Sequence, residues 1–375
     1  MNRKYYIYII ILSLFIKLVY VLLFYIFSQL GWCSVSVDYT NFLDVFFKND
    51  AGWYEKIALY GYPNITEVWE LGGYHDGSLV QSSWAFFPLL PKITAGYCSL
   101  FNMAFKPMSF ILICIFSTLC FLQIFNYAKT KITTNNAFLF TLLFMLFPLH
   151  LHYNVYYTEA LFLFLIISSI LAIDKNKILL LAVLSSLIIL TRPNGVIIIV
   201  FLFLYTINKY FITIKNNKLV LLKRLMIYIV PLIVFVGYLV YQYQYTGNYF
   251  AFATAQKGWE KERIFPLLAL FRKGDLMNQF NSIYITIFIA FVILTFKKYS
   301  WTTHFLIWTT ILIPLSAGSV TSITRYVSIL IPVYLVMYSY IQTKNKMVVY
   351  SLAFCFAILH IYFLFQWINS QPITY

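Results

Sequence analysis

Residues 5–30 read YYIYIIILSLFIKLVYVLLFYIFSQL, a run that is almost entirely apolar or aromatic. A helix needs about 20 such residues to cross the hydrocarbon core of a bilayer. The run is too long for the apolar core of a signal peptide, and no small-residue cleavage site follows it. Arg3 and Lys4 precede it, and basic residues beside a span mark its cytoplasmic side. The sequence therefore predicts a retained first transmembrane helix with a cytoplasmic N-terminus.

Similar apolar runs recur along the rest of the chain. Of its 375 residues, 62% are hydrophobic and only 10% are charged, whereas a soluble domain has about 25% charged residues. Strands of a membrane β-barrel would be shorter and would alternate apolar and polar residues. The composition therefore predicts an all-α polytopic membrane protein in which residues 1–375 form a single membrane domain.

Eleven apolar segments are expected to span the membrane. They are residues 5–30, 107–127, 137–152, 156–173, 178–190, 195–210, 225–245, 282–296, 301–317, 323–341 and 347–367. A further apolar segment, 85–101, is short and contains Pro88, Pro91 and Lys92. We expect it to be a juxtamembrane or re-entrant helix, because the basic loops then all fall on the side of the N-terminus, as the positive-inside rule requires.

The basic loops carry much of the formal net charge of +15. Their clusters are Lys129/Lys131, Lys175/Lys177, Lys209–Arg224, Lys297/Lys298 and Lys344/Lys346. Short clusters between spans are typical of cytoplasmic loops and not of a surface that reads nucleic acid, so no nucleic-acid partner is expected. The five cysteines show no metal-ligand spacing, which favours a role in apolar packing.

Two long segments are expected on the outer, extracytoplasmic side, residues 31–107 and 246–281. All acidic residues except Asp174 fall on this side or at the outer membrane face. Long loops in a compact protein are usually functional or disordered, and the many aromatic residues here favour ordered structure at the membrane interface. The outer face is therefore the predicted working face, and the C-terminus is expected there too.

The first outer segment contains NDAGWYEKIALYGY at residues 49–62. Trp53, Ile57 and Tyr60 share one face at helical spacing, which predicts an amphipathic helix at the membrane interface. Asp50 stands at the start of this helix. It is either a helix N-cap or a carboxylate held at the membrane surface as a general base.

Further ionisable residues lie at the outer ends of spans. Glu159 is either a helix N-terminal acid or an active-site acid. His150 and His152 do not share a helical face, so a helical metal pair is not expected. Arg192 and Arg325 either reach toward lipid headgroups or bind a phosphate with paired N–H donors. Two arginines that face the same acidic loop suggest one anionic group between them.

Five segments, taken in this order, resemble the membrane mannosyltransferases related to the second mannosyltransferase of GPI-anchor assembly and their bacterial relatives. They are residues 49–62, 85–91, 157–162, 192–195 and 247–259. Four residues depart from the family pattern. Asn49 replaces a tryptophan, Trp84 replaces a histidine before Ala85, and Asn248-Tyr249 replaces Asp-Pro.

The resemblance implies a GT-C-type glycosyltransferase fold and transfer of a hexose, typically mannose, from a polyprenyl-phosphate donor. It also implies a site outside the cytoplasm, with Asp50 acting at an unknown glycan or lipid acceptor. We expect the bacterial inner membrane, or the ER membrane if the chain is eukaryotic. We expect Arg192 and Arg325 to bind the donor phosphate. The expected substrate contacts are Trp53, Tyr54, His152, Glu159, Gln256 and Trp259.

No metal and no cofactor beyond the lipid-linked donor is expected. Two other functions fit a chain of many spans, a flippase for lipid-linked sugars and a non-catalytic scaffold. A transporter is expected to show internal repeats and interrupted helices at the membrane midplane. In this sequence the acidic residues and Arg192 and Arg325 concentrate at one face, which favours the enzyme.

Overall fold

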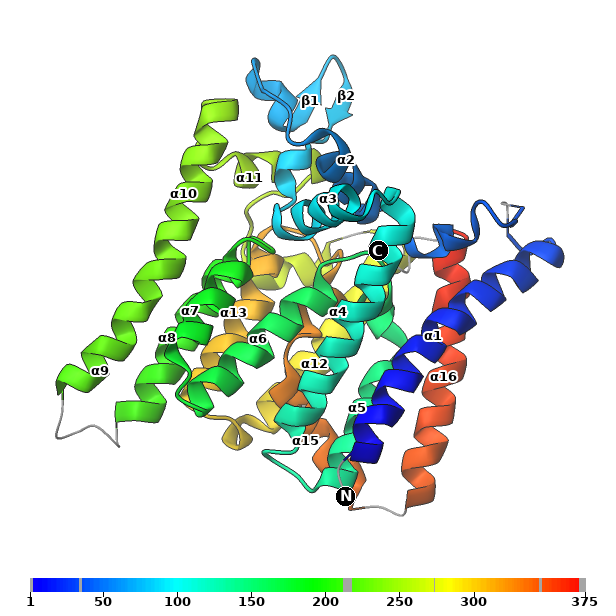
Figure 1. Ribbon diagram of the computed structural model, residues 1–375, viewed down its shortest axis with the longest axis vertical. Helices are drawn as coiled ribbons and strands as arrows, with labels where there is room; N and C mark the ends of the chain where they lie inside the picture. Colours follow the sequence, from blue (N-terminus) through cyan, green and yellow to red (C-terminus); the bar gives the residue numbers. More distant parts are fainter. Residues whose placement is uncertain (1–2, 34–35, 212–217, 273, 344–345, 371–375) are drawn as a thin grey trace.

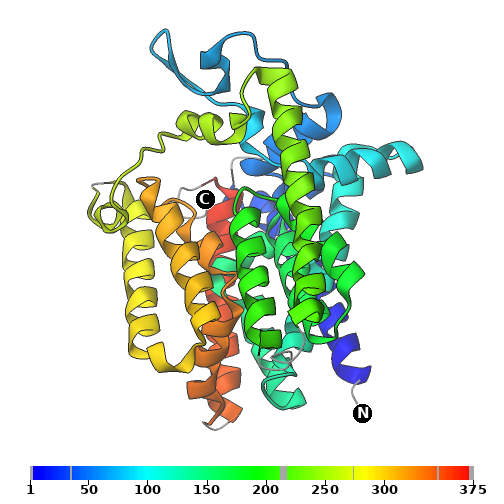
Figure 2. The same ribbon diagram turned by 90° about the vertical axis from the view of Figure 1, so that its left-hand side faces the viewer.

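The computed structural model describes residues 3–33, 36–211, 218–272, 274–343 and 346–370. Long helices run side by side, and α2 (Asp50–Tyr60), α3 (Leu89–Phe101) and the hairpin of β1 (Gly73–His75) and β2 (Ser78–Val80) gather at one end of them (Figures 1 and 2). This end is hereafter the loop end. The first helix, α1 (Arg3–Gln29), begins at the opposite end.

The other helices have the following bounds. They are α4 (Phe105–Ala128), α5 (Thr134–Leu146), α6 (Glu159–Asp174), α7 (Ile178–Ile189), α8 (Gly195–Phe211), α9 (Lys218–Leu225), α10 (Ile229–Thr246), α11 (Ala251–Thr254), α12 (Leu276–Leu294), α13 (Trp301–Ser316), α14 (Ile323–Val327), α15 (Ile331–Gln342) and α16 (Lys346–Ile368). Short 3-10 helices are η1 (Phe42–Phe46), η2 (Val68–Leu71), η3 (Ser83–Ala85), η4 (Pro148–Asn154), η5 (Met226–Tyr228), η6 (Ala255–Trp259), η7 (Pro266–Phe271) and η8 (Phe296–Lys298). Each predicted span overlaps at least one of these helices.

Several helices present apolar side chains on their outer faces. Within the described residues, five helices are long and apolar enough to cross a membrane, namely α1, α4, the segment Leu221–Thr246, α12 and α16. Leu18, Ile233 and Phe354 are each more than 60% exposed on them. Water would make such broad apolar faces costly, whereas lipid does not. The predicted polytopic membrane protein is confirmed.

The remaining apolar helices are shorter than a simple crossing. A helix rises about 1.5 Å per residue, so the 12 residues of α7 cover about 18 Å of a hydrocarbon core about 30 Å thick. The bent pair of α5 and η4 would bring the number of candidate spans among the described residues to six. The count of eleven spans therefore stays a prediction.

Two predicted spans are not continuous helices. Residues 137–152 bend by 88° between α5 and η4, where Pro148 is the first residue of η4. Residues 323–341 break between α14 and α15, and Pro332 lies in the first turn of α15. Proline lacks a backbone N–H and disfavours helix in the residue before it. Each of these two predicted spans is therefore two helices, and in both cases a proline lies at the start of the second helix.

The loop that connects α2 to α4 contains the helix expected not to cross. In both views α3 lies across the ends of the long helices, at the loop end (Figures 1 and 2). This orientation agrees with a juxtamembrane helix. The helix α2 begins at Asp50 as predicted, with Asn49 and not Asp50 as its N-cap residue.

The ends of the helices also separate the charges. The connection between α4 and α5, the end of α8 and the start of α16 lie at the same end as the start of α1 (Figure 1). Within the predicted basic clusters, residues 212–217 and Lys344 lie outside the described residues. Asp174, the one acid expected on the cytoplasmic side, forms an ion pair with Lys209.

Candidate active site

Four charged side chains from distant parts of the sequence form one continuous series of ion pairs. Asp50 Oδ2 accepts from Arg325 Nη1 at 2.8 Å. Arg325 Nε donates to Glu159 Oε1 at 2.7 Å, and Arg192 Nη1 donates to the same oxygen at 2.7 Å. These four residues are hereafter the ion-pair network. Three of them were predicted as catalytic or phosphate-binding residues, and the fourth, Glu159, as a substrate contact.

Each member of the network is placed by the start of a helix or by a tight turn. Asp50 and Glu159 are the first residues of α2 and α6, where the helix dipole favours a negative charge. Arg325 lies in α14. Arg192 lies in the turn between α7 and α8, and this turn depends on Gly195, because a Cβ there would lie 2.5 Å from the carbonyl oxygen of Ile188.

Burial decreases along the network from Glu159 to Asp50. The side chain of Glu159 is fully buried, that of Arg325 is 6% exposed, and that of Asp50 is 26% exposed. Buried charges are costly unless they are paired, and Glu159 supplies the inner partner for both arginines. The guanidinium of Arg325 also lies 4.4 Å from the ring centre of Tyr157, a favourable cation–π contact.

A cavity of about 170 Å³ opens beside the network; it is hereafter the small cavity. Six of the nine predicted site residues line it. They are Asp50, Tyr54, Arg192, Gln256, Trp259 and Arg325. These residues come from α2, the α7–α8 turn, η6 and α14. The small cavity therefore lies between the two predicted outer segments and the ends of predicted spans.

The other three predicted site residues are not part of its lining. Trp53 stacks on Phe86 at 5.8 Å between ring centres and meets Trp259 edge to face. His152 is buried and stacks on Tyr157. Glu159 lies beneath the two arginines. Trp53, His152 and Glu159 therefore do not line the small cavity, and their expected contacts with substrate stay a prediction.

The residues in the wall supply both hydrogen-bond donors and acceptors. The hydroxyls of Tyr54 and Thr158 lie 3.4 Å apart. Burial, together with the nearby Asp50 carboxylate, raises the pKa of Tyr54, so its phenol stays protonated. Lys261 Nζ donates to Gln256 Oε1 at 2.7 Å.

Sequence reasoning missed Lys261 and Tyr326, which both line the small cavity. Lys261 stands in the mixed-charge run Glu260–Arg263, which shows no motif. Tyr326 directly follows Arg325, and its ring lies 5.5 Å from the guanidinium of Arg192. Its position directly after Arg325 is the one feature of the sequence that pointed to Tyr326.

The small cavity has an excess of positive charge. Arg192, Lys261 and Arg325 line it, against one lining carboxylate, Asp50. Among the described residues, the Nε and Nη2 groups of Arg192 have no hydrogen-bond acceptor, and Asp50 Oδ1 has no hydrogen-bond donor. The cavity can therefore bind an anion at Arg192 and accept a proton at Asp50.

Within the described ranges, no group of three or more His, Cys, Asp or Glu side chains is arranged to hold a metal ion. A reaction without a metal stays a prediction.

The chain gives no match to the models of known protein families and none to curated proteins. The resemblance to membrane mannosyltransferases therefore rests on the five segments alone. Four of these segments, 49–62, 85–91, 192–195 and 247–259, contribute residues to the wall of the small cavity. The fifth, 157–162, contributes Glu159 to the ion-pair network.

Proposed function

We propose that the chain is a GT-C-type glycosyltransferase that transfers a hexose from a polyprenyl-phosphate donor to an acceptor, with mannose as the first candidate for the hexose. The reaction takes place on the extracytoplasmic side of a bacterial inner membrane. One observation carries this proposal. Asp50, Arg192 and Arg325 meet at one small cavity at the loop end of a bundle of apolar helices. The eleven-span topology, with the loop end outside, belongs to the same proposal.

The position of the small cavity suits a lipid-linked donor. A polyprenyl tail dissolves in the hydrocarbon core, so its phosphate and sugar lie at the depth where membrane helices end. Arg192 has free N–H groups at the loop end, where the proposed topology puts the membrane surface. Paired guanidinium donors stabilise the negative charge that develops on a departing phosphate, which lowers the barrier to release of polyprenyl phosphate.

Asp50 supplies the base. Its carboxylate takes the proton of the acceptor hydroxyl while that oxygen forms a bond to the anomeric carbon. The bond between the anomeric carbon and the phosphate oxygen breaks, and polyprenyl phosphate leaves with the bonding electron pair. The hydrogen bond from Arg325 to Oδ2 fixes the orientation of the carboxylate and leaves Oδ1 for the proton.

Purified full-length chain in detergent is expected to transfer labelled mannose from polyprenyl-phosphate mannose to members of an acceptor panel. Arg192→Lys keeps the charge and the pairing with Glu159, but it removes the planar set of donors. We expect this variant to raise the donor KM about tenfold, because about 1.4 kcal/mol corresponds to a factor of ten.

Arg224→Lys is the matched control, since Arg224 lies in α9 and not at the loop end, and its donor KM is expected to equal that of the wild type. Absence of transfer to every acceptor would contradict the proposed function. An unchanged donor KM in Arg192→Lys would contradict the phosphate-binding role of Arg192.

Reporter fusions test the proposed orientation. A reporter placed after Gly61, at the end of α2, is expected to be active only outside the cytoplasm. A second reporter after Lys131, between α4 and α5, is expected to be active only in the cytoplasm. The reverse pattern would place the ion-pair network on the cytoplasmic side and contradict an extracytoplasmic reaction.

A further inference from the structure

A second, larger cavity adjoins the small one. It has a volume of about 1200 Å³, and the two cavities share Trp259, Lys261, Ser319 and Thr321 in their walls. It is hereafter the vestibule. Pockets that bind drug-sized ligands measure about 300–1,000 Å³, so the vestibule has room for a ligand of several sugar units.

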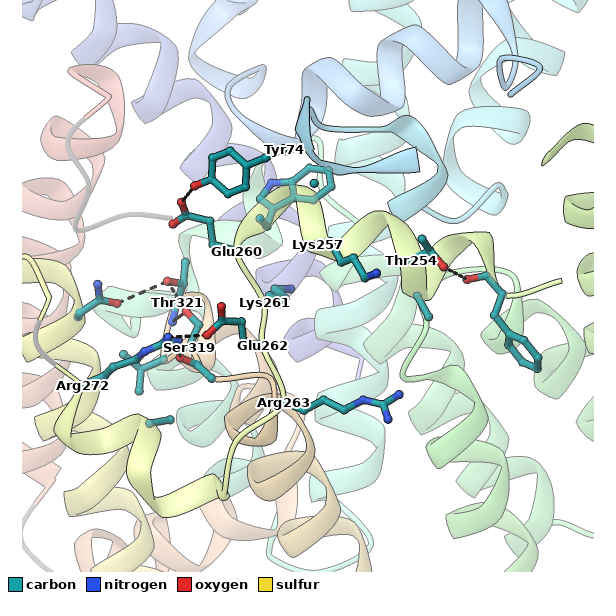
Figure 3. A pocket seen from close by; sticks show the side chains of 18 residues that line it. Tyr74, Thr254, Lys257, Glu260, Lys261, Glu262, Arg263, Arg272, Ser319 and Thr321 are labelled. Carbon is teal, nitrogen blue, oxygen red and sulfur yellow. Dashed lines mark hydrogen bonds and ion pairs between the residues drawn. The ribbon is translucent and has the colours of Figure 1, made fainter. Parts of the chain in front are cut away.

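Charged side chains from the second outer segment surround the vestibule (Figure 3). Four are basic and two are acidic: Lys257, Lys261, Arg263, Arg272, Glu260 and Glu262. Both acids already have partners. Arg272 Nη2 pairs with Glu262 at 2.8 Å, and the Tyr74 hydroxyl donates to Glu260 at 2.6 Å.

The basic residues are only partly neutralised in this way. Arg272 is used by Glu262 and by the carbonyl oxygen of Gly318, and Lys261 donates to Gln256. The side chains of Lys257 and Arg263, which both line the vestibule, have no hydrogen bond or ion pair with any described residue. Figure 3 shows both side chains extending away from the two paired acids. Three of the four cations, Lys257, Lys261 and Arg263, therefore have no acidic partner among the described residues, and the side chains of Lys257 and Arg263 also make no hydrogen bond with them.

We propose that the vestibule binds the acceptor and that this acceptor is an anionic oligosaccharide, one that carries phosphate or carboxylate groups. Lys257 and Arg263 bind its anionic groups, and the rings of Trp259 and Tyr74 offer apolar faces to its sugar rings. This inference rests on the proposed function, in which an acceptor hydroxyl reaches Asp50 in the small cavity. The vestibule shares Trp259 and Lys261 with that cavity.

A neutral glycan would need none of this charge. Two unpaired cations at the mouth of a reaction site attract anions over about a Debye length. The acids are held by Arg272 and Tyr74, so they do not repel an anionic ligand as strongly as free carboxylates would.

Equilibrium binding tests the inference. The full-length Asp50→Asn variant, in nanodiscs of neutral lipid at low salt, is titrated with fluorescent mannobiose and with the same disaccharide bearing a 6-phosphate. We expect the phosphorylated probe to bind about tenfold more tightly, as two charge-assisted hydrogen bonds allow. Adding Lys257→Gln and Arg263→Gln is expected to bring the ratio of the two Kd values close to one.

Lys92→Gln is the matched control, since Lys92 is an exposed cation of α3 that lines neither the small cavity nor the vestibule. It is expected to keep the tenfold preference. Equal binding of both probes, or a preference that survives the double substitution, would overturn the inference. Complete displacement of the phosphorylated probe by phosphatidylglycerol would also overturn it, because the vestibule would then be a lipid-headgroup site.

The transfer assay separates this inference from the proposed function. Transfer to acceptors of either charge with equal KM would support the glycosyltransferase and contradict an anionic acceptor site. A retained binding preference with no transfer to any acceptor would contradict the glycosyltransferase, and the acceptor role of the vestibule with it, while supporting the anion-binding residues.

Discussion

Replacing Asp50 by asparagine is expected to reduce sugar transfer by about 10²–10⁴-fold, which is the usual contribution of a general acid or base. Asparagine has nearly the same size and still accepts a hydrogen bond from Arg325. It cannot take a proton from the acceptor hydroxyl. Arg325 keeps its pairing with the buried Glu159, so the fold and the binding of donor at Arg192 are expected to persist.

The measurements are the transfer rate with labelled polyprenyl-phosphate mannose and the equilibrium binding of that donor. Glu55→Gln is the matched control, since Glu55 lies on the same helix but does not line the small cavity, and its transfer rate is expected to be normal. A wild-type rate in Asp50→Asn would contradict the role of Asp50 as base. A flippase would still move the lipid-linked sugar across the bilayer in this variant, and a scaffold would show no transfer in either protein.

The sequence pointed to several features of the fold through local rules. Proline and lysine within residues 85–101 made that segment ambiguous, and the distribution of the basic loops indicated a helix that does not cross. In the structure α3 lies across the ends of the long helices. The spacing of residues 49–62 predicted α2, which begins at Asp50. Helix periodicity acts within about a dozen residues, and the charge of each loop can be read without knowing any tertiary contact, so one sequence carries both signals.

Other features depend on contacts between distant segments. Arg325 lies 166 positions from Glu159 and 275 from Asp50 in the sequence. The sequence suggested an anionic group between Arg192 and Arg325, and in the structure this group is the Glu159 carboxylate itself. No periodic pattern encodes such a pairing, because it depends on how α6, α14 and the α7–α8 turn pack together.

The arginines also illustrate why a role cannot be assigned from residue type alone. Both were expected at the outer ends of spans, either beside lipid headgroups or beside a phosphate. The structure buries them against Glu159 and leaves part of Arg192 at the small cavity. This burial argues against the alternative that the two arginines reach toward lipid headgroups. The binding of a phosphate at the free N–H groups of Arg192 belongs to the proposed function.

The second large effect is expected for Glu159→Gln. Glutamine preserves the shape of the side chain but removes its charge, so the network changes from two positive and two negative charges to two positive and one negative. Arg192 and Arg325 then remain buried beside a neutral amide. Removing one partner of a buried ion pair costs about 3–5 kcal/mol, and we expect the free energy of unfolding to fall by about this amount.

The measurement is the midpoint of unfolding in mild detergent under a titration with sodium dodecyl sulfate. The double variant Glu159→Gln/Arg192→Gln restores the balance of charge and is expected to recover part of the lost stability, because only Arg325 and Asp50 then remain as a charged pair. Loss of packing alone would make the double variant less stable than the single one. That result, or a wild-type midpoint for Glu159→Gln, would mean that Glu159 does not hold the two arginines in place by its charge.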